Sequence, residues 1–210
     1  MDFINPLGIK YRIVKEVTHE GRPARVVSGS ATFDTDLEDM WDAVTNRERI
    51  PRWFLPISGE LKPGGNYQLE GNAGGKVTRC DPPEAFDVTW EWGDNISWVR
   101  VRLDAHDGGT RPTLEHIMRK DEANEEHWRK YGPGATGVGW DLGFVGLLLH
   151  LRTGESVPQD ESNAWLATKN GKTFIRECSA AWGDAHIGSG EDESIARDMA
   201  KQTAQFYCGE

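Results

Sequence analysis

Residues Gly132 to Leu151 read GPGATGVGWDLGFVGLLLHL and decide the fold, because a glycine-rich lead-in opens into the longest apolar segment of the chain. From residue 138 onward the apolar residues fall into two stripes at helical spacing: Trp140, Phe144, Leu147, Leu148 and Leu151, and then Val138, Leu142, Val145 and Leu149. A helix that is apolar nearly all round is buried on more than one side. At about 1.5 Å per residue the helix spans only about 20 Å, and Asp141 and His150 interrupt it, so it is too short and too polar to cross a membrane. We therefore expect a central helix that is gripped on one face and covered on the other.

Length and charge limit the class of protein. A chain of 210 residues predicts one domain, residues 1–160, with a helical extension, residues 161–210, that is packed on the central helix and is not independent. A net charge of −10 argues against partners such as nucleic acid or an anionic membrane, both of which attract basic proteins. The first residues lack the profile of a signal peptide. Three widely spaced cysteines indicate reduced thiols, which predicts a cytoplasmic location.

Before the central helix the hydrophobic pattern has a period of two, which is typical of strands with one buried face. We expect a strand at 25–33 and further strands at 57–61, 66–71, 76–81, 85–93, 97–105 and 111–120, with an irregular arm or edge strand within 1–22. Short turns between them predict an antiparallel meander. One face of such a sheet needs a cover, and the apolar helix can supply it.

The remaining segments show helical patterns. Asp36 can cap a helix that runs to about Thr45, and a short second helix is expected over residues 48–54. Residues 121–131 predict a surface link or a short helix, and residues 152–163 a polar linker. Two amphipathic helices then follow, at 172–185 and after Asp192, the second with a stripe of Ile195, Met199, Thr203 and Phe206.

Four stretches carry a family resemblance: ATFDTDLEDMWDAVTNRERIPRWF, GGNYQLEGNAGGKVTRCDPPEAFDVTWEWG, GTRPTLEH and the glycine-led helix. Over residues 24–153 they resemble the SRPBCC (START-like) superfamily, in the branch named after the activator of the heat-shock-protein-90 ATPase. YGPGATGVGWD and the helical pair near the end look like a bacterial sub-branch, for which the resemblance implies no reaction. It implies an α+β helix-grip fold, in which a curved antiparallel sheet wraps a long helix around a cavity. Pro112 departs from the family pattern and indicates an edge or an irregularity in its strand.

Gly132, Gly134 and Gly137 spell GxGxxG, the fingerprint of dinucleotide binding. The motif lacks a preceding buried strand and a βαβ unit, so we predict no nucleotide cofactor and no other cofactor. The glycines can instead allow tight turns and a close approach of helix and sheet. A third interpretation is a hinged loop that gates the cavity.

His116 is the titratable residue that falls on an inward strand face, between Leu114 and Met118. It is either a general acid/base in the cavity or a core histidine whose hydrogen bonds are satisfied. Asp141 can be its catalytic partner, or a residue that caps or ion-pairs at the start of the central helix. The other histidines share no metal-ligand spacing, so we predict no metal site.

Aromatic residues form the most informative set, because tryptophans packed this densely tend to leave gaps. An aromatic-lined cavity with few polar groups is typical of a small-molecule site. We expect the following ligand-binding residues: Trp53, Phe54, Tyr67, Leu69, Trp90, Trp92, Val99, Val101, Leu114, His116, Trp140, Phe144, Leu147 and Leu148.

Three functions remain open from the sequence. The first is binding of a hydrophobic or aromatic small molecule between sheet and helix, by a monomer or a homodimer. The second is a cyclase- or hydrolase-type enzyme in the same cavity, with His116 and Asp141 as catalytic candidates. The third, which the resemblance implies, is a chaperone-associated interaction module.

Overall fold

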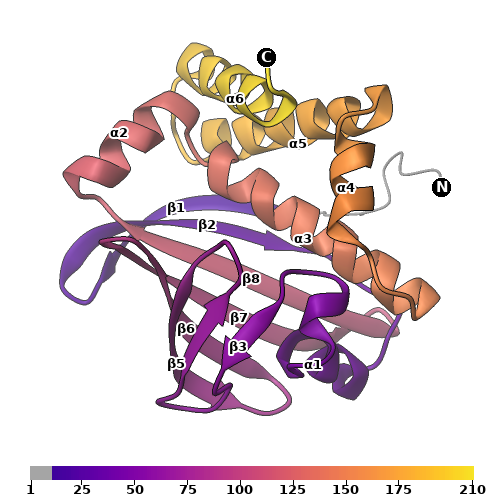
Figure 1. Cartoon of the computed structure of the whole chain (residues 1–210). Helices are drawn as coiled ribbons and strands as arrows, with labels where there is room; N and C mark the ends of the chain where they lie inside the picture. The colour runs from indigo at the N-terminus through magenta and orange to yellow at the C-terminus, as the bar shows by residue number, and fades with distance from the viewer. Residues whose placement is uncertain (1–10) are drawn as a thin grey trace.

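An eight-stranded antiparallel sheet forms the base of the protein, whose computed structural model describes residues 11–210 (Figure 1). The strands lie in the order β1-β2-β8-β7-β6-β5-β4-β3. Their bounds are β1 Tyr11–His19, β2 Arg22–Ser30, β3 Ile57–Gly59, β4 Asn66–Leu69, β5 Gly74–Asp81, β6 Ala85–Trp92, β7 Asn95–His106 and β8 Gly109–Arg119. The predicted meander is confirmed, and β1 is the edge strand expected within 1–22. Residues 1–10 of that segment lie outside the described part.

The register of the strands explains the buried face of the sheet. Val88 pairs with Val99, and Val101 pairs with Leu114, so apolar side chains from three adjacent strands share one face. Each of these four residues is buried. Because the side-chain period is two, a slip of one residue would turn every one of them to the opposite face.

One residue on the outer face of the sheet is buried, although that face was expected to be exposed to solvent. Trp98 lies on that outer face, but it is buried against Val26 and Ile117. His19 packs against its ring at 4.3 Å, and the Arg119 guanidinium lies 4.7 Å from the ring centre. The expectation of one wet face is therefore wrong at Trp98, because an aromatic residue there gathers its own small cluster.

Helices cover the inner face of the sheet. Their bounds are α1 Leu37–Thr45, the 3-10 helix η1 Ile50–Arg52, α2 Glu122–Tyr131, α3 Gly134–Thr153, α4 Gln159–Leu166, α5 Lys169–Gly188 and α6 Glu193–Cys208. Asp36 caps α1 by accepting a hydrogen bond from the Asp39 N–H, and Asp192 caps α6 through the Ile195 N–H, both as expected. The predicted linker at 152–163 is only partly irregular, because α4 begins within it.

Helix α3 lies between the sheet and the pair α5 and α6, which confirms the helix-grip architecture (Figure 1). By length and composition it is the one helix among residues 11–210 that could cross a membrane, and over half of that window is buried inside the protein. Such burial is typical of the core helix of a folded domain.

The glycine-rich lead-in is mostly helix, which corrects the expected loop. Gly132 ends α2 with a φ of +57°, whereas Gly134 and Gly137 belong to the first turns of α3. A Cβ on Gly137 would lie 2.1 Å from the Trp182 ring, and one on Gly134 would lie 2.8 Å from Thr203. The close approach is therefore between α3 and the two C-terminal helices, and not between helix and sheet.

Helix α6 buries a different stripe from the one predicted. Met199 and Thr203 are buried, but Ile195 is 47% exposed and Phe206 is 58% exposed. Ala196 and Ala200 complete the buried face. Small residues fit here because α5 and α6 approach closely, as at Gly183, where a Cβ would lie 3.1 Å from Ala200.

Pro112 sits at an irregularity in β8, which is one of the two alternatives that its missing N–H predicted. Leu103, which faces it across the β7–β8 pair, donates its own N–H to the Glu84 carbonyl at 2.8 Å on the side of β6. The nitrogen of Pro112 consequently points away from β7. On that side the ladder is interrupted, because the last pair of β2 with β8 joins Ser30 to Thr113 and pairing resumes at the bridge between Phe33 and Thr110.

Candidate ligand-binding cavity

A cavity of about 160 Å³ lies between the sheet, α3 and the segment that runs from α1 through η1. The lining comes from six strands, α1, η1, α3 and their connections, and it is almost wholly apolar. The lining residues are Val44, Thr45, Ile50, Trp53, Phe54, Ile57, Leu61, Tyr67, Leu69, Val77, Cys80, Phe86, Val88, Trp90, Val99, Val101, Pro112, Leu114, Trp140, Gly143, Phe144 and Leu147.

The structure brings most of the sequence-predicted site residues together around this space. Those that line it are Trp53, Phe54, Tyr67, Leu69, Trp90, Val99, Val101, Leu114, Trp140, Phe144 and Leu147. Three do not: Leu148 packs against the core elsewhere, His116 lies behind two tryptophans, and Trp92 is 59% exposed. Trp92 lies outside the cavity because it pairs with Asn95 at the exposed hairpin end of β6.

Sequence reasoning missed half of the wall. The alternation in β6 puts Phe86 and Val88 on the same face as Trp90, so the pattern alone could have included them. Val44 has the helical spacing of an inward-facing residue, but nothing marked Ile50, and only the folding of α1 and η1 over one end of the sheet turns both residues toward the cavity.

Aromatic rings form a continuous wall on one side of the cavity. Phe54 stacks on Trp140 with ring centres 6.1 Å apart and planes 18° apart, and Trp53 lies beside Phe54 at 5.4 Å. Trp90 meets Trp140 edge-on at 5.1 Å.

His116 is held behind this wall by a chain of hydrogen bonds. The Trp140 indole N–H donates to His116 Nδ1 at 3.1 Å, which places the imidazole proton on Nε2. His116 Nε2–H then donates to Ser97 Oγ at 2.9 Å, and Ser97 donates to the Trp90 carbonyl at 3.0 Å. Both ring nitrogens are thus engaged. Burial lowers the pKa of His116 to about 4, so the imidazole is neutral at pH 7.

This histidine should make the stability of the fold depend on pH. Its pKa falls from 6.5 to about 4 on folding, so the stabilisation is complete above pH 6.5 and is lost as the pH falls toward 4. A shift of this size corresponds to about 3 kcal/mol. We expect His116→Asn to abolish this part of the slope in urea unfolding measured from pH 7 to pH 4. Other groups titrate in both the wild type and the variant, so the readout is the difference between the two pH dependences of the unfolding free energy. Identical pH dependences would contradict the lowered pKa of His116.

Asp141 does not partner His116, which corrects the candidate catalytic pair. It is 1% exposed and accepts hydrogen bonds from Arg12 Nη2 and from Trp182 Nε1, each at 3.0 Å. Burial raises the pKa of Asp141 although the Arg12 charge opposes that shift. The ion-pairing alternative is therefore the correct one, but its expected place at the start of the helix is wrong, because α3 begins at Gly134 and Asp141 lies about two turns further on. The ion pair joins β1, α3 and α5.

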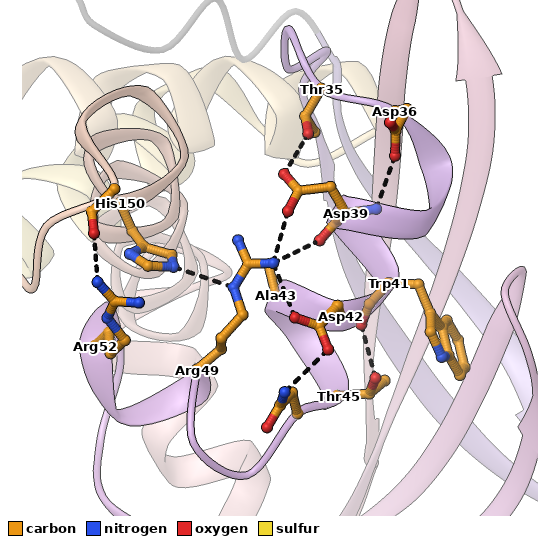
Figure 2. A network of polar contacts seen from close by, with 12 residues as sticks. Thr35, Asp36, Asp39, Trp41, Asp42, Ala43, Thr45, Arg49, Arg52 and His150 are labelled. Carbon is orange, nitrogen blue, oxygen red and sulfur yellow. Dashed lines mark hydrogen bonds and ion pairs between the residues drawn. The ribbon is translucent and has the colours of Figure 1, made fainter.

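A polar clamp holds the α1–η1 segment over the cavity (Figure 2). Arg49 Nη1 donates to Asp39 at 2.6 Å and to Asp42 at 2.9 Å, and its Nε donates to His150 Nε2 of α3 at 3.3 Å. His150 Nδ1 lies 2.8 Å from the Glu155 carbonyl, which completes its hydrogen bonds. None of these four side chains lines the cavity, so the clamp fixes the α1–η1 segment without adding polarity to the cavity.

Metal ligation has no support in the described part of the chain. Residues 11–210 contain no group of three or more His, Cys, Asp or Glu side chains arranged to hold a metal ion. The glycines of the GxGxxG motif lie against α5 and α6, and none of them lines the cavity. They are therefore not placed to gate its mouth.

The fold and the cavity define a helix-grip protein of the SRPBCC superfamily, as the resemblance implied. The chain belongs to the family described as Activator of Hsp90 ATPase homolog 1-like protein, whose model matches residues 34–145.

Solved structures agree with this family. CalU16 from Micromonospora echinospora is 26% identical, and its solution structure covers 86% of this chain and 96% of its own with a TM-score of 0.70. The crystal structure of CalU16 covers 83% and 96%, with a TM-score of 0.66. MLL2253 from Mesorhizobium loti, at 21% identity, covers 61% of this chain and 98% of its own with a TM-score of 0.53, and it supports the fold alone. No match was found among curated proteins.

Proposed function

We propose that the protein binds a hydrophobic or aromatic small molecule in the cavity between the sheet and α3. The observation that carries the proposal is the apolar cavity itself, lined by Trp53, Phe54, Trp90 and Trp140 at a total volume of about 160 Å³. A dry cavity of about 150 Å³ is sufficient for benzene. With rings on its wall, this space suits a ligand that inserts one or two fused aromatic rings.

Acid/base catalysis has less support than binding. A general base needs a nitrogen within reach of substrate, whereas His116 uses both nitrogens in hydrogen bonds to Trp140 and Ser97. Asp141 lies on the other side of α3, toward α5. The cyclase or hydrolase alternative therefore lacks residues in working positions, and we propose no reaction.

The family supports the chaperone-associated alternative, because its description names an activator of the Hsp90 ATPase. A surface that binds a chaperone would be expected to be exposed and apolar. Tyr131 and Phe206 pack at 5.3 Å on the side of α2 and α6, with Phe206 exposed. Stimulation of an Hsp90 ATPase by the purified protein would favour this alternative. The cytoplasmic location and the homodimer stay predictions.

A fluorescence titration tests the binding proposal. We expect N-phenyl-1-naphthylamine to bind with one site per chain and to quench tryptophan emission. Trp140→Ala should weaken binding by about tenfold or more, because the variant loses the contact between the indole ring and the ligand. A tenfold change in Kd corresponds to about 1.4 kcal/mol, which is a modest value for the contact of an indole ring. Trp92→Ala is the matched control, because this exposed residue lies outside the cavity. Equal losses in the two variants would contradict a site in this cavity.

Cys80 gives an independent readout of occupancy. It lines the cavity, whereas Cys178 and Cys208 are buried elsewhere. Burial raises the pKa of the Cys80 thiol, so its alkylation should be slow but measurable at pH 8.5. Bound ligand should slow it further, and an unchanged rate at saturating ligand would place the ligand elsewhere.

A further inference from the structure

We infer that the ligand is an uncharged aromatic molecule with a hydrogen-bond acceptor, and that the indole N–H of Trp90 is the donor that anchors it. This inference rests on the proposed function and narrows it to a ligand class and a specificity-determining residue. Three features of the cavity wall support this inference. Within the described part of the chain, the wall has no charged side chains, most of its hydrogen-bond donors are paired within the protein, and one donor has no partner.

No side chain that is ionised at neutral pH lines the cavity. No Asp, Glu, Lys or Arg belongs to the lining, and burial raises the pKa of both Tyr67 and Cys80, which keeps them neutral. An ionised ligand group brought inside would lose its hydration without gaining a counter-ion, a cost of several kcal/mol. The cavity therefore discriminates against charge of either sign.

The polar atoms of the wall are nearly all engaged within the protein. Trp53 Nε1 donates to the Ala43 carbonyl at 2.9 Å, and Trp140 Nε1 donates to His116. The Tyr67 hydroxyl donates to the Thr89 carbonyl at 2.7 Å, and the Thr45 hydroxyl donates to the Trp41 carbonyl at 2.7 Å. A ligand that competed for these donors would leave a protein carbonyl or imidazole unpaired, which is costly in a buried site.

Trp90 is the exception among the three tryptophans of the wall. Its Nε1 donates to no residue within 11–210, although the side chain is half-buried and lines the cavity. The ring is fixed in place, since it meets Trp140 at 5.1 Å and His116 at 6.0 Å. This N–H is not sealed from solvent, so water is its acceptor in the free protein. A carbonyl, ether or hydroxyl oxygen on a ligand in the cavity would take the place of that water.

Three isosteric naphthalenes test the charge discrimination. 2-Acetylnaphthalene is neutral, 2-naphthoate is an anion at pH 7 and 2-(aminomethyl)naphthalene is a cation. We expect the neutral compound to displace N-phenyl-1-naphthylamine at a concentration at least about tenfold lower than either ion. If none of the three binds, the proposed function itself fails. If all bind equally, binding in the cavity stands and the inference about charge is overturned.

A double comparison tests the anchor. 2-Ethylnaphthalene has the shape of 2-acetylnaphthalene without the acceptor oxygen, so the wild type should prefer the acetyl compound by about tenfold, as expected for one buried hydrogen bond. Trp90→Phe should keep most of the affinity for 2-ethylnaphthalene and lose the preference. Trp53→Phe is the control, because the Trp53 N–H is used within the protein, and it should keep the preference. An acetyl preference that survives in Trp90→Phe, or is absent from the wild type, would overturn the assignment of Trp90.

Discussion

A chain that ends at Thr153 is expected to aggregate instead of melting cooperatively. The removed helices cover the side of α3 that faces away from the sheet, where Trp182 packs on Gly137 and Thr203 packs on Gly134. The Tyr207 hydroxyl also donates to the Ala135 carbonyl at 2.7 Å. Without these contacts a long apolar stripe of α3 would face water, and exposed patches of this kind drive association.

Size-exclusion chromatography with light scattering, followed by thermal denaturation, measures this outcome. A chain that ends at Cys208 is the control, because it removes only Glu210 and Gly209 and loses the exposed ion pairs of Glu210 with Lys172 and Arg176. The control should stay monodisperse with a melting temperature near that of the full chain. A soluble truncation at Thr153 with an unchanged melting temperature would contradict our proposal that residues 161–210 are an integral extension of the domain.

Asp141→Ala is expected to cost about 3–5 kcal/mol of unfolding free energy, which is typical of a buried ion pair that loses one partner. The carboxylate accepts from both Arg12 and Trp182, so its removal leaves two donors unpaired at the junction of β1, α3 and α5. Within residues 11–210, Arg12 Nε is already buried without a partner, and Asp141 supplies the one carboxylate that pairs with this arginine. Asp141→Ala therefore removes a contact that links the sheet, through Arg12 of β1, to the C-terminal extension, through Trp182 of α5.

Urea unfolding at pH 7 measures the effect, with two further variants for comparison. Asp141→Asn keeps an acceptor for the Trp182 N–H but no charge for Arg12, so its loss should be smaller. Asp198→Ala changes an exposed acid of α6 and should stay within about 0.5 kcal/mol of the wild type. If Asp141→Ala were as stable as Asp198→Ala, the carboxylate would have no role in holding the extension.

Local sequence pattern was sufficient for the elements and for the face of each strand. The alternation in β6 and β7 placed Val88, Trp90 and Val99 on the inner face, where the structure has them. Capping chemistry likewise located the starts of α1 and α6 at Asp36 and Asp192. These features depend on neighbours within a few residues, so a sequence contains them directly.

What covers a face is decided by distant parts of the chain. Trp92 continues the same alternation as Trp90, yet it lies at the end of the hairpin and is 59% exposed. The opposite error occurred at Trp98, whose outward face is covered by Val26, Ile117 and the ends of neighbouring strands. The alternation of residue types along a strand predicts the face to which a side chain points, but not whether that side chain is buried.

The sequence by itself determined the sheet, the central apolar helix and the aromatic character of the site, because each follows from the spacing of residue types along one element. Only the tertiary structure decided the partners of His116 and Asp141. Trp140 and Asp141 are adjacent in sequence but about 100° apart around α3, at 3.6 residues per turn. One consequently meets His116 on the sheet side, while the other meets Trp182 on the side of α5. The helical phase therefore turns Trp140 and Asp141 toward different neighbours, and only the packing of the sheet, α3 and α5 shows which neighbour each one meets.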